Sequence, residues 1–407
     1  MNKYTPHQNL IAFKCYKSVK KLRLLNYYAY ICSKIERETV MLIKFAVKNF
    51  RGFKERIEWD LSHSGNYTFN SYAIKDGVIK NGIIYGPNGA GKSNLGIALF
   101  DIVNHLTQKH KSDRHYKNFT YGGYSALNVL FEYTFNLGNQ IIEYQYKKNY
   151  EGILVEESLI VEGKIVFNRK NQHLDLDEKQ FPINSNAKKN LQANANNISI
   201  VNYLLTSYPL AKNHYLIKLR NFVDTMLWFR CLGVNEFMGF ENSPTNLDEF
   251  IIKNNLINDF SDFLYKVSGQ KYDFDLEKST DKLLFWKAGT GSLVFDTTIS
   301  TGTQSLHLLY YWLKRISGAS FVFIDEFDAF YHFRLSLEVC KQLFNLDCQV
   351  FTSSHNTYLM TNDLLRPDCN FILQDNTIKP LQACTEKEIR FGHNIEKIYR
   401  AGAFNVE

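Results

Sequence analysis

The sequence predicts an α/β fold in which strands and helices alternate on both sides of a glycine-rich turn. Residues 82–85 form a short apolar strand that leads directly into this turn and a following helix. Residues 127–171 alternate apolar and polar side chains, which is typical of an antiparallel meander. Residues 320–374 then return to strand–helix alternation. The 407 residues are 45% hydrophobic and 22% charged, a balance that excludes wholesale disorder and fits a globular protein.

The remaining elements follow from the same patterns. Strands at 42–48 and 55–61 are expected to form a hairpin, and a helix from about 92 to 105 should follow the glycine-rich turn. Residues 187–268 are expected to be a helical insertion, because their large apolar residues recur at helix-compatible spacing. These residues are Leu204, Leu205, Leu210, Leu216, Leu219, Phe222 and Met226. The final third should contain strands at 320–325, 348–352 and 370–374, and helices at about 333–346 and 356–365.

Four segments result from this assignment. They are a basic N-terminal extension at 1–40, a first lobe with the β meander at 41–186, a helical insertion or lid at 187–268, and a second lobe at 269–407. The extension holds eight Lys or Arg and two acidic residues, which is +6 of the formal net charge of +7 and leaves +1 for the rest. We interpret it as a disordered tail or as sequence upstream of a second start at Met41, in preference to a basic helix that contacts a partner.

Composition excludes several classes of protein. Because the rest of the chain is nearly neutral, binding of nucleic acid through an overall positive field is disfavoured. Binding through a local basic patch remains an alternative. No apolar run is long enough to cross a bilayer, so an integral membrane protein is not expected. The seven cysteines nowhere form a C-x-x-C pair, which argues against zinc or disulfides and favours a reducing, cytoplasmic compartment. They are Cys15, Cys32, Cys231, Cys340, Cys348, Cys369 and Cys384.

The glycine-rich turn is a full match to the phosphate-binding pattern G-x-x-x-x-G-K-[ST]. Its glycines let successive backbone amides point at phosphate oxygens, and the helix that follows adds its positive end. Lys92 would reach the β- and γ-phosphates of ATP, and the Ser93 hydroxyl would ligate Mg²⁺. The predicted nucleotide-binding residues are Gly86, Pro87, Asn88, Gly89, Ala90, Gly91, Lys92, Ser93 and Asn94.

A pair of acidic residues, Asp325 and Glu326, follows the apolar strand Phe321–Ile324. An aspartate at the tip of a buried strand can orient the magnesium shell, so Asp325 is predicted to act with Ser93 as a metal ligand. Glu326 would then face the water that attacks the γ-phosphate, as a general base or water-positioning residue. The phosphate loop upstream strengthens this interpretation, since each motif supplies the context that the other needs.

Two further segments, Ser300–Gln304 and the histidine after strand 349–352, make the chain resemble the ABC-type ATPases, the superfamily that contains the SMC and RecF proteins. The resemblance implies an ABC-type P-loop ATPase head with an antiparallel β subdomain and a helical insertion. It implies that two subunits sandwich ATP, with the signature of one capping the γ-phosphate bound to the other. By motif position, the signature residues are Ser300, Gly302 and Gln304, the switch histidine is His355, and the D-loop residue is Asp328. The signature here is S-T-G-T-Q rather than L-S-G-G-Q, and both Gln140 and Gln145 stay open as the Q-loop glutamine.

A narrower resemblance covers Met41 to the C-terminus and points to the stand-alone, RecF-like AAA-family ATPases of bacteria. Members of that group serve as the ATPase of anti-phage defence systems, including PARIS-like and Septu-like ones, beside a separate effector. The segments that support it are Val47–Phe53, Phe131–Leu159, Glu326–His332, Leu364–Asp368 and His393–Phe404. The implied partners are a second copy of the chain and either an effector, which would be a nuclease or a toxin, or a phage trigger protein.

Our first hypothesis is therefore a cytoplasmic ATP hydrolase that acts as a conformational switch in phage defence. The alternative is a RecF-like ATPase in DNA binding or repair. A transporter subunit is disfavoured by the divergent signature and the large insertion. Only 52 residues follow His355, so we expect no appended nuclease domain. The insertion also lacks the sustained heptads of SMC arms.

Overall fold

The computed structural model describes residues 40–62, 65–109, 119–138, 140–194, 198–230, 235–243 and 245–404. The predicted basic extension at 1–40 lies outside these residues except for Val40, which begins the first strand. A compact unit begins at Val40. All of the elements described below belong to the unit that begins at Val40.

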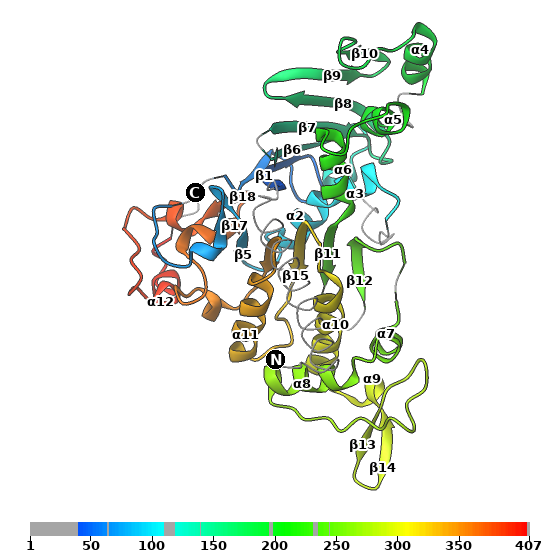
Figure 1. Cartoon of the computed structure of the whole chain (residues 1–407). Helices are drawn as coiled ribbons and strands as arrows, with labels where there is room; N and C mark the ends of the chain where they lie inside the picture. Colours follow the sequence, from blue (N-terminus) through cyan, green and yellow to red (C-terminus); the bar gives the residue numbers. More distant parts are fainter. Residues whose placement is uncertain are drawn as a thin grey trace, which may run out of the picture. The chain divides into compact units, whose positions relative to one another are not determined.

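One seven-stranded sheet is antiparallel throughout, in the order β10-β9-β8-β7-β6-β1-β2 (Figure 1). Every second side chain of β6 is buried, so one face of the sheet packs on the core and the other does not. This sheet confirms the predicted hairpin and the predicted meander. Its strands are β1 (Val40–Lys48), β2 (Ile57–Asp60), β6 (Val129–Leu137), β7 (Ile141–Lys148), β8 (Leu154–Val161), β9 (Lys164–Lys170) and β10 (His173–Leu176).

The second seven-stranded sheet has five parallel strands between two antiparallel edges, in the order β12-β11-β15-β16-β5-β17-β18. Strands β5, β15 and β16 are buried along their whole length, as expected when both faces of a parallel sheet are covered. The predicted α/β class is confirmed. The strands are β5 (Asn81–Tyr85), β11 (Met226–Arg230), β12 (Glu236–Gly239), β15 (Phe321–Asp325), β16 (Gln349–Ser353), β17 (Asn370–Gln374) and β18 (Thr377–Pro380).

Two short hairpins and the helices complete the described part of the chain. The hairpins are β3 (Ile74–Lys75) with β4 (Val78–Ile79) and β13 (Phe285–Ala288) with β14 (Gly291–Val294). The α-helices are α2 (Lys92–Leu99), α3 (Asp101–Leu106), α4 (Ser185–Ala193), α5 (Ile200–Ser207), α6 (Tyr215–Asp224), α7 (Leu247–Lys253), α8 (Ile257–Ser268), α9 (Phe295–Thr298), α10 (Thr301–Arg315), α11 (Phe333–Phe344) and α12 (Ile395–Arg400). Single 3₁₀ turns lie at Ser71–Ala73, Tyr121–Gly123, Thr357–Leu359, Pro367–Cys369 and Leu381–Cys384.

Helix α2 and an aromatic cluster join the two sheets. The helix contacts both β1 and β15, and a Cβ at Gly96 would come within 2.7 Å of the Phe323 ring, so only glycine fits there without displacing that ring. Trp59 of β2 meets Phe323, Phe351 and Phe371 edge-on, with ring centroids 4.8 to 6.4 Å apart. The helix that follows the phosphate loop is therefore fixed between the sheets.

The predicted helical insertion at 187–268 is wrong in its middle. Helices α4 to α8 cover much of the segment, but β11 and β12 interrupt it. Strand β11 pairs in parallel with β15 inside the second, mostly parallel sheet, which we call the core sheet. Met226, which was assigned to a helical stripe, begins β11 and is buried. A short run of apolar residues has no periodicity that distinguishes a buried strand from a helix. Here the long-range pairing with β15 makes the segment a strand.

The predicted helix at 356–365 is also wrong, because the segment forms only the 3₁₀ turn Thr357–Leu359 followed by further turns. The Asn356 side chain accepts the Tyr358 N–H and closes a local turn. The Asn362 amide donates to the carbonyls of Arg390 and Phe391 instead of facing a helix surface. Short polar side chains that bind the backbone in this way compete with helix formation.

A buried ionic network links the antiparallel sheet to the helices beyond it. The Glu157 carboxylate accepts from Arg169 Nη2 at 3.0 Å and from the Ile200 amide, the first residue of α5, at 2.8 Å. Burial alone would raise the pKa of Glu157, but the neighbouring His105, 3.9 Å away, and the Arg169 charge lower it to about 2. Because this pKa lies below its ordinary value, the stabilisation is complete above about pH 4.5 and is lost as the pH falls toward 2.

Replacing Glu157 by Gln should lower the free energy of unfolding by about 3–5 kcal/mol, because the buried Arg169 charge loses its partner. Urea unfolding at pH 7 measures the loss, and a repeat between pH 5 and 3 should show a weaker acid dependence than in the wild type. The neighbouring half-buried pair Lys147–Glu156 is the matched control, since solvent reaches it and Glu156→Gln should cost no more than about 1 kcal/mol. Equal losses for the two variants would contradict this account of the network.

Candidate functional site

Three of the predicted functional segments follow the carboxyl ends of parallel strands at one edge of the core sheet. The phosphate loop follows β5, Asp325 ends β15, and His355 lies two residues after β16. Strand β5 pairs with β16, and β16 pairs with β15. Ligands of open α/β sheets bind outside these carboxyl ends, and this edge is therefore the candidate site.

The phosphate loop has the backbone that its glycines were predicted to allow. Gly89 and Gly91 have φ values of 80° and 102°, and Gly91 caps α2 in the left-handed region. A Cβ at Gly86 would collide with the carbonyl oxygen of Leu373, and one at Gly91 would lie 2.8 Å from the Phe53 ring. The loop thus has the form of a cradle at the N-terminus of a helix, which suits an anion.

Lys92 is buried at the start of α2, and its ammonium donates to the loop's own carbonyls, Gly86 O at 2.8 Å and Pro87 O at 3.1 Å. Burial lowers its pKa, and the charges of Asp325 and Glu326 oppose this shift. The ammonium is therefore held inside the cradle, near both carboxylates. The Ser93 hydroxyl makes no hydrogen bond to any residue that the structure describes, which leaves it available to a ligand.

Asp325 is fully buried and both of its carboxylate oxygens have partners. The Arg230 guanidinium donates to Oδ2 through Nε at 3.0 Å and Nη2 at 2.6 Å, and the Ser353 hydroxyl donates to Oδ1 at 2.7 Å. Arg230 ends β11, directly beside Asp325 in the parallel register. The sequence patterns identified Asp325 but missed Arg230, because the pairing joins residues 95 positions apart.

Glu326 has a φ of 50°, in the left-handed region that residues other than glycine rarely adopt. Its amide donates to Ser353 Oγ at 2.8 Å, so one serine holds Asp325 and the strained residue after it. Within the described ranges, the Glu326 carboxylate takes part in no hydrogen bond or ion pair. Strain of this kind clusters at functional sites, and an unengaged carboxylate beside Lys92 suits the predicted role of base.

His355 and Asp328 lie on the loops that follow β16 and β15. The His355 side chain is exposed, and partial desolvation and the Lys92 charge lower its pKa, which favours a neutral imidazole at pH 7. Asp328 accepts from Ser354 Oγ at 2.8 Å, and burial raises its pKa to about 6. The Ser354 bond connects the loop after β15 to the loop that carries His355.

The predicted signature residues lie at the N-terminus of α10. Ser300 is the exposed N-cap, and its Oγ accepts the Thr303 N–H at 3.2 Å. Gly302 lies close to the Phe330 carbonyl, and the Gln304 amide donates to Asp296 O at 2.9 Å. Over the ranges that the structure describes, no hydrogen bond or ion pair joins these residues to the phosphate loop of the same chain.

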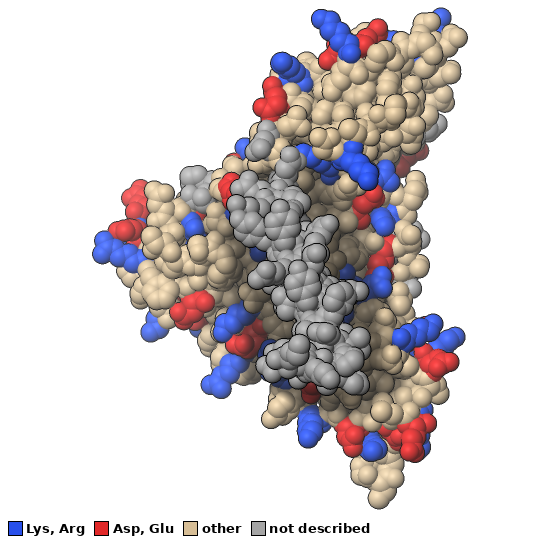
Figure 2. All heavy atoms as spheres, in the orientation of Figure 1, with Lys and Arg blue, Asp and Glu red and all other residues tan. Residues whose placement is uncertain are grey.

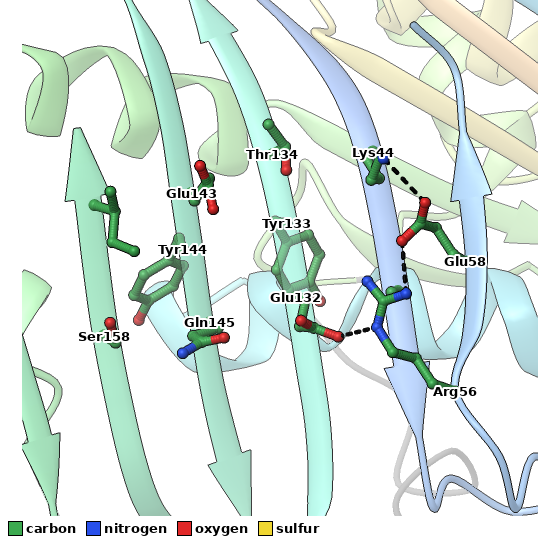
Figure 3. A pocket seen from close by; sticks show the side chains of 12 residues that line it. Lys44, Arg56, Glu58, Glu132, Tyr133, Thr134, Glu143, Tyr144, Gln145 and Ser158 are labelled. Carbon is green, nitrogen blue, oxygen red and sulfur yellow. Dashed lines mark hydrogen bonds and ion pairs between the residues drawn. The ribbon is translucent and has the colours of Figure 1, made fainter. Parts of the chain in front are cut away.

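Neither candidate for the Q-loop glutamine lies at the carboxyl edge of the core sheet. Gln140 precedes β7, and its carbonyl accepts the Leu137 N–H. Gln145 lies on β7 and lines a pocket of about 380 Å³ on the antiparallel sheet (Figure 3). That pocket is crossed by the ion pairs of Lys44 with Glu58, and of Arg56 with Glu58 and Glu132.

Charge and hydropathy add two findings. Figure 2 shows Lys and Arg interspersed with Asp and Glu on the face that it presents, outside the grey atoms. Among the helices that the structure describes, none is both long and apolar enough to cross a membrane.

The site fits ATP and Mg²⁺ on three observations. Gly89 and Gly91 hold the loop in a left-handed backbone at the start of α2, the Ser93 hydroxyl is unengaged by described residues, and the charges of Asp325 and Glu326 act on Lys92. Mg²⁺ in nucleotide sites is held by one or two side chains together with phosphates and water. Ser93 and Asp325 would supply the hydroxyl and carboxylate of such a set.

A family model described as "AAA domain, putative AbiEii toxin, Type IV TA system" matches residues 83–361, more than half of the chain. Among curated proteins, none matches.

Solved structures that are similar include the Smc head domain with a coiled coil and joint from Pyrococcus yayanosii, at 11% identity and a TM-score of 0.44, covering 89% of this chain and 100% of that one. The SMC head domain from Thermotoga maritima has 15% identity and a TM-score of 0.37, covering 83% and 97%. The recombination mediator protein RecF has 14% identity and a TM-score of 0.38, covering 84% and 99%.

Proposed function

The chain belongs to the AAA domain family whose model spans residues 83–361, and from this premise we propose that it is an ATP hydrolase that works as a conformational switch. The observation that carries the proposal is the meeting of the phosphate loop, Asp325 and the strained Glu326 at one sheet edge. The loop amides and Lys92 would bind the phosphates. Glu326 would take or orient the proton of the attacking water.

In this proposal Mg²⁺ would be held by Ser93 and Asp325, and when bound it neutralises charge on the β- and γ-phosphates. Lys92 would exchange the carbonyls of Gly86 and Pro87 for phosphate oxygens. His355, neutral at pH 7, would donate one N–H to the same end of the nucleotide. The Ser354–Asp328 bond would couple that contact to the loop after β15.

We also propose that two copies enclose the nucleotide. Ser300 at the start of α10 is exposed, Gly302 and Gln304 are half-buried, and none of the three bonds to the phosphate loop of its own chain within the described ranges. The signature could therefore face a second copy. A helix N-terminus with a serine cap is suited to the γ-phosphate of that partner. A closed pair related by a two-fold axis has two such sites, and hydrolysis through Glu326 would loosen it.

We propose that the switch acts in anti-phage defence in the cytoplasm. Its partner would be either a separate effector, which is a nuclease or a toxin, or a phage trigger protein. This role is supported by the narrower resemblance and by the toxin–antitoxin description of the family. The alternative, a RecF-like ATPase on DNA, is weakened by the near-neutral body and by the interspersed charges in Figure 2, because DNA binding depends on many phosphate contacts.

The two-site arrangement predicts complementation between two inactive variants. Lys92→Ala spoils the phosphate loop and Gly302→Asp spoils the signature, so each pure dimer has two defective sites. In a mixed dimer one site carries both defects and the other carries none. After random exchange, an equal mixture should regain about a quarter of wild-type hydrolysis if the sites act independently.

The matched control mixes Lys92→Ala with the double variant Lys92→Ala/Gly302→Asp, which contains no intact phosphate loop and should stay inactive. Thermal melts must first show that Gly302→Asp folds, since a Cβ at that glycine lies 3.1 Å from Phe330 O. Exchange is followed with labelled protein. If exchange occurs without recovery, and the ATP-bound Glu326→Gln chain is a monomer in solution, the two-copy site is wrong.

A further inference from the structure

Arg230 is placed between two carboxylates on neighbouring strands. Its guanidinium donates twice to Asp325 on β15, and its Nη1 lies 3.8 Å from Glu236 Oε2 on β12. Arg230 is in register with both residues, in parallel with Asp325 and antiparallel with Glu236. The Arg230 guanidinium can therefore pair with a carboxylate on either neighbouring strand while its backbone stays in β11.

The present partner of Arg230 is the carboxylate that the proposed metal site requires. Asp325 is fully buried, and the fork from Arg230 neutralises its charge. A guanidinium and a divalent cation cannot both hold the same oxygen at full strength, since each repels the other. The pair also needs a compensating acceptor if it opens, because an unpaired buried charge is costly. Glu236 is that acceptor, already within ion-pair distance.

We propose that Arg230 is an exchangeable positioning residue, which pairs with Asp325 as the structure shows and moves to Glu236 when Mg²⁺ with nucleotide takes Asp325. The inference deepens the proposed function and rests on it. Arg230 would thus keep Asp325 in place before the metal arrives, and would set how much Mg²⁺ the site needs. The same exchange would strengthen the ion pair between Arg230 of β11 and Glu236 of β12 when Mg²⁺ and nucleotide are bound. The bound and unbound states of the switch would then differ in the carboxylate that Arg230 pairs with.

Two variants should shift the Mg²⁺ requirement in opposite directions. The full chain carrying Glu326→Gln, which is expected to bind ATP without turnover, is saturated with ATP in EDTA-treated buffer and titrated with MgCl₂ by calorimetry. Adding Arg230→Gln should lower the half-saturating Mg²⁺ concentration by about tenfold, because the competitor is gone. Adding Glu236→Gln should raise it by about tenfold, because the displaced guanidinium has no acceptor. A purely structural role would impair Mg²⁺ binding in both variants.

A spectroscopic readout follows Arg230 itself. The guanidinium lies 5.6 Å from the centre of the buried Trp228 ring, so its movement should change the fluorescence of that indole. Addition of Mg²⁺ to the ATP-bound chain should give a fluorescence change that is absent in Arg230→Gln and reduced in Glu236→Gln. Arg230→Lys, which keeps the charge and loses the fork, should lower the Mg²⁺ requirement by a smaller factor and serves if Arg230→Gln does not fold.

The outcomes distinguish a failure of this inference from a failure of the proposed function. If the parent chain binds no ATP, the proposed function fails, and the inference fails with it. If ATP binds but neither Arg230 variant shifts the Mg²⁺ requirement, only the inference is overturned. If Arg230→Gln shifts it while Glu236→Gln does not, the move to Glu236 is wrong, and the guanidinium must pair with the phosphates instead.

Discussion

The Glu326→Gln variant should bind ATP and hydrolyse it about 10²–10⁴ times more slowly than the wild type. The amide keeps the size and shape of the side chain but cannot accept the proton of the attacking water. Backbone contacts of the site should survive, because Ser353 holds residue 326 through its amide and not through its carboxylate. Phosphate release under saturating ATP measures the loss, and size measurements should show an ATP-bound oligomer that accumulates.

The control for this prediction is Glu338→Gln, which removes an exposed carboxylate of α11 that pairs with Lys341. Its hydrolysis rate should equal that of the wild type. Turnover of Glu326→Gln within threefold of the wild type would remove Glu326 from the proposed role. A second variant, Glu326→Gly, tests the strain: glycine adopts a φ of 50° freely, so its melting temperature should not fall even though hydrolysis is lost.

The contiguous parts of the site were predictable because their chemistry is local. The phosphate loop needs three glycines, a lysine and a serine within eight residues, and this spacing can be read without knowledge of the fold. Asp325 is the last of the five buried residues of β15 and Glu326 follows it, so strand and acidic pair also lie together in the sequence. The structure brings both segments to one edge, as the strand–turn–helix order predicts.

Arg230 could not be found in the same way, because its role depends on a strand pairing between distant segments. The run Met226–Phe229 is too short to show a period, and the surrounding leucines favoured a helix. One signal was present: Trp228 and Phe229 are residues that prefer strands. The predicted helix at 356–365 failed for a related reason, since Asn362 satisfies its amide on carbonyls some thirty residues away.

The assignments that depend on a second copy stay predictions for a physical reason. Ser300, Gly302 and Gln304 are placed by the local geometry of α10, and their contacts explain how that helix begins. Nothing in one chain requires them to meet a phosphate. The Q-loop glutamine also stays unassigned, because Gln145 lies on the antiparallel sheet and the residue that pairs with Asp325 is Arg230 and not a glutamine.

Lys92→Ala should weaken ATP binding by about 30-fold or more, since removing one partner of a desolvated charge pair costs about 2–5 kcal/mol. The ammonium is already inside the cradle, where it rests on Gly86 O and Pro87 O. It therefore needs to move little to meet a phosphate. Calorimetry with ATP and Mg²⁺ measures the loss, and hydrolysis should become undetectable at ATP concentrations that saturate the wild type.

The fold should survive this change, because Arg230 still neutralises Asp325 and the loop loses only the two hydrogen bonds from Lys92 to Gly86 O and Pro87 O. A melting temperature within a few degrees of the wild type checks that point. Lys75→Ala removes an exposed lysine that pairs with Asp347, and it should leave ATP affinity unchanged. Equal affinity of Lys92→Ala and the wild type for ATP would mean that the loop does not bind phosphate. The roles proposed for Asp325, Glu326 and Arg230 would then lose their common ligand.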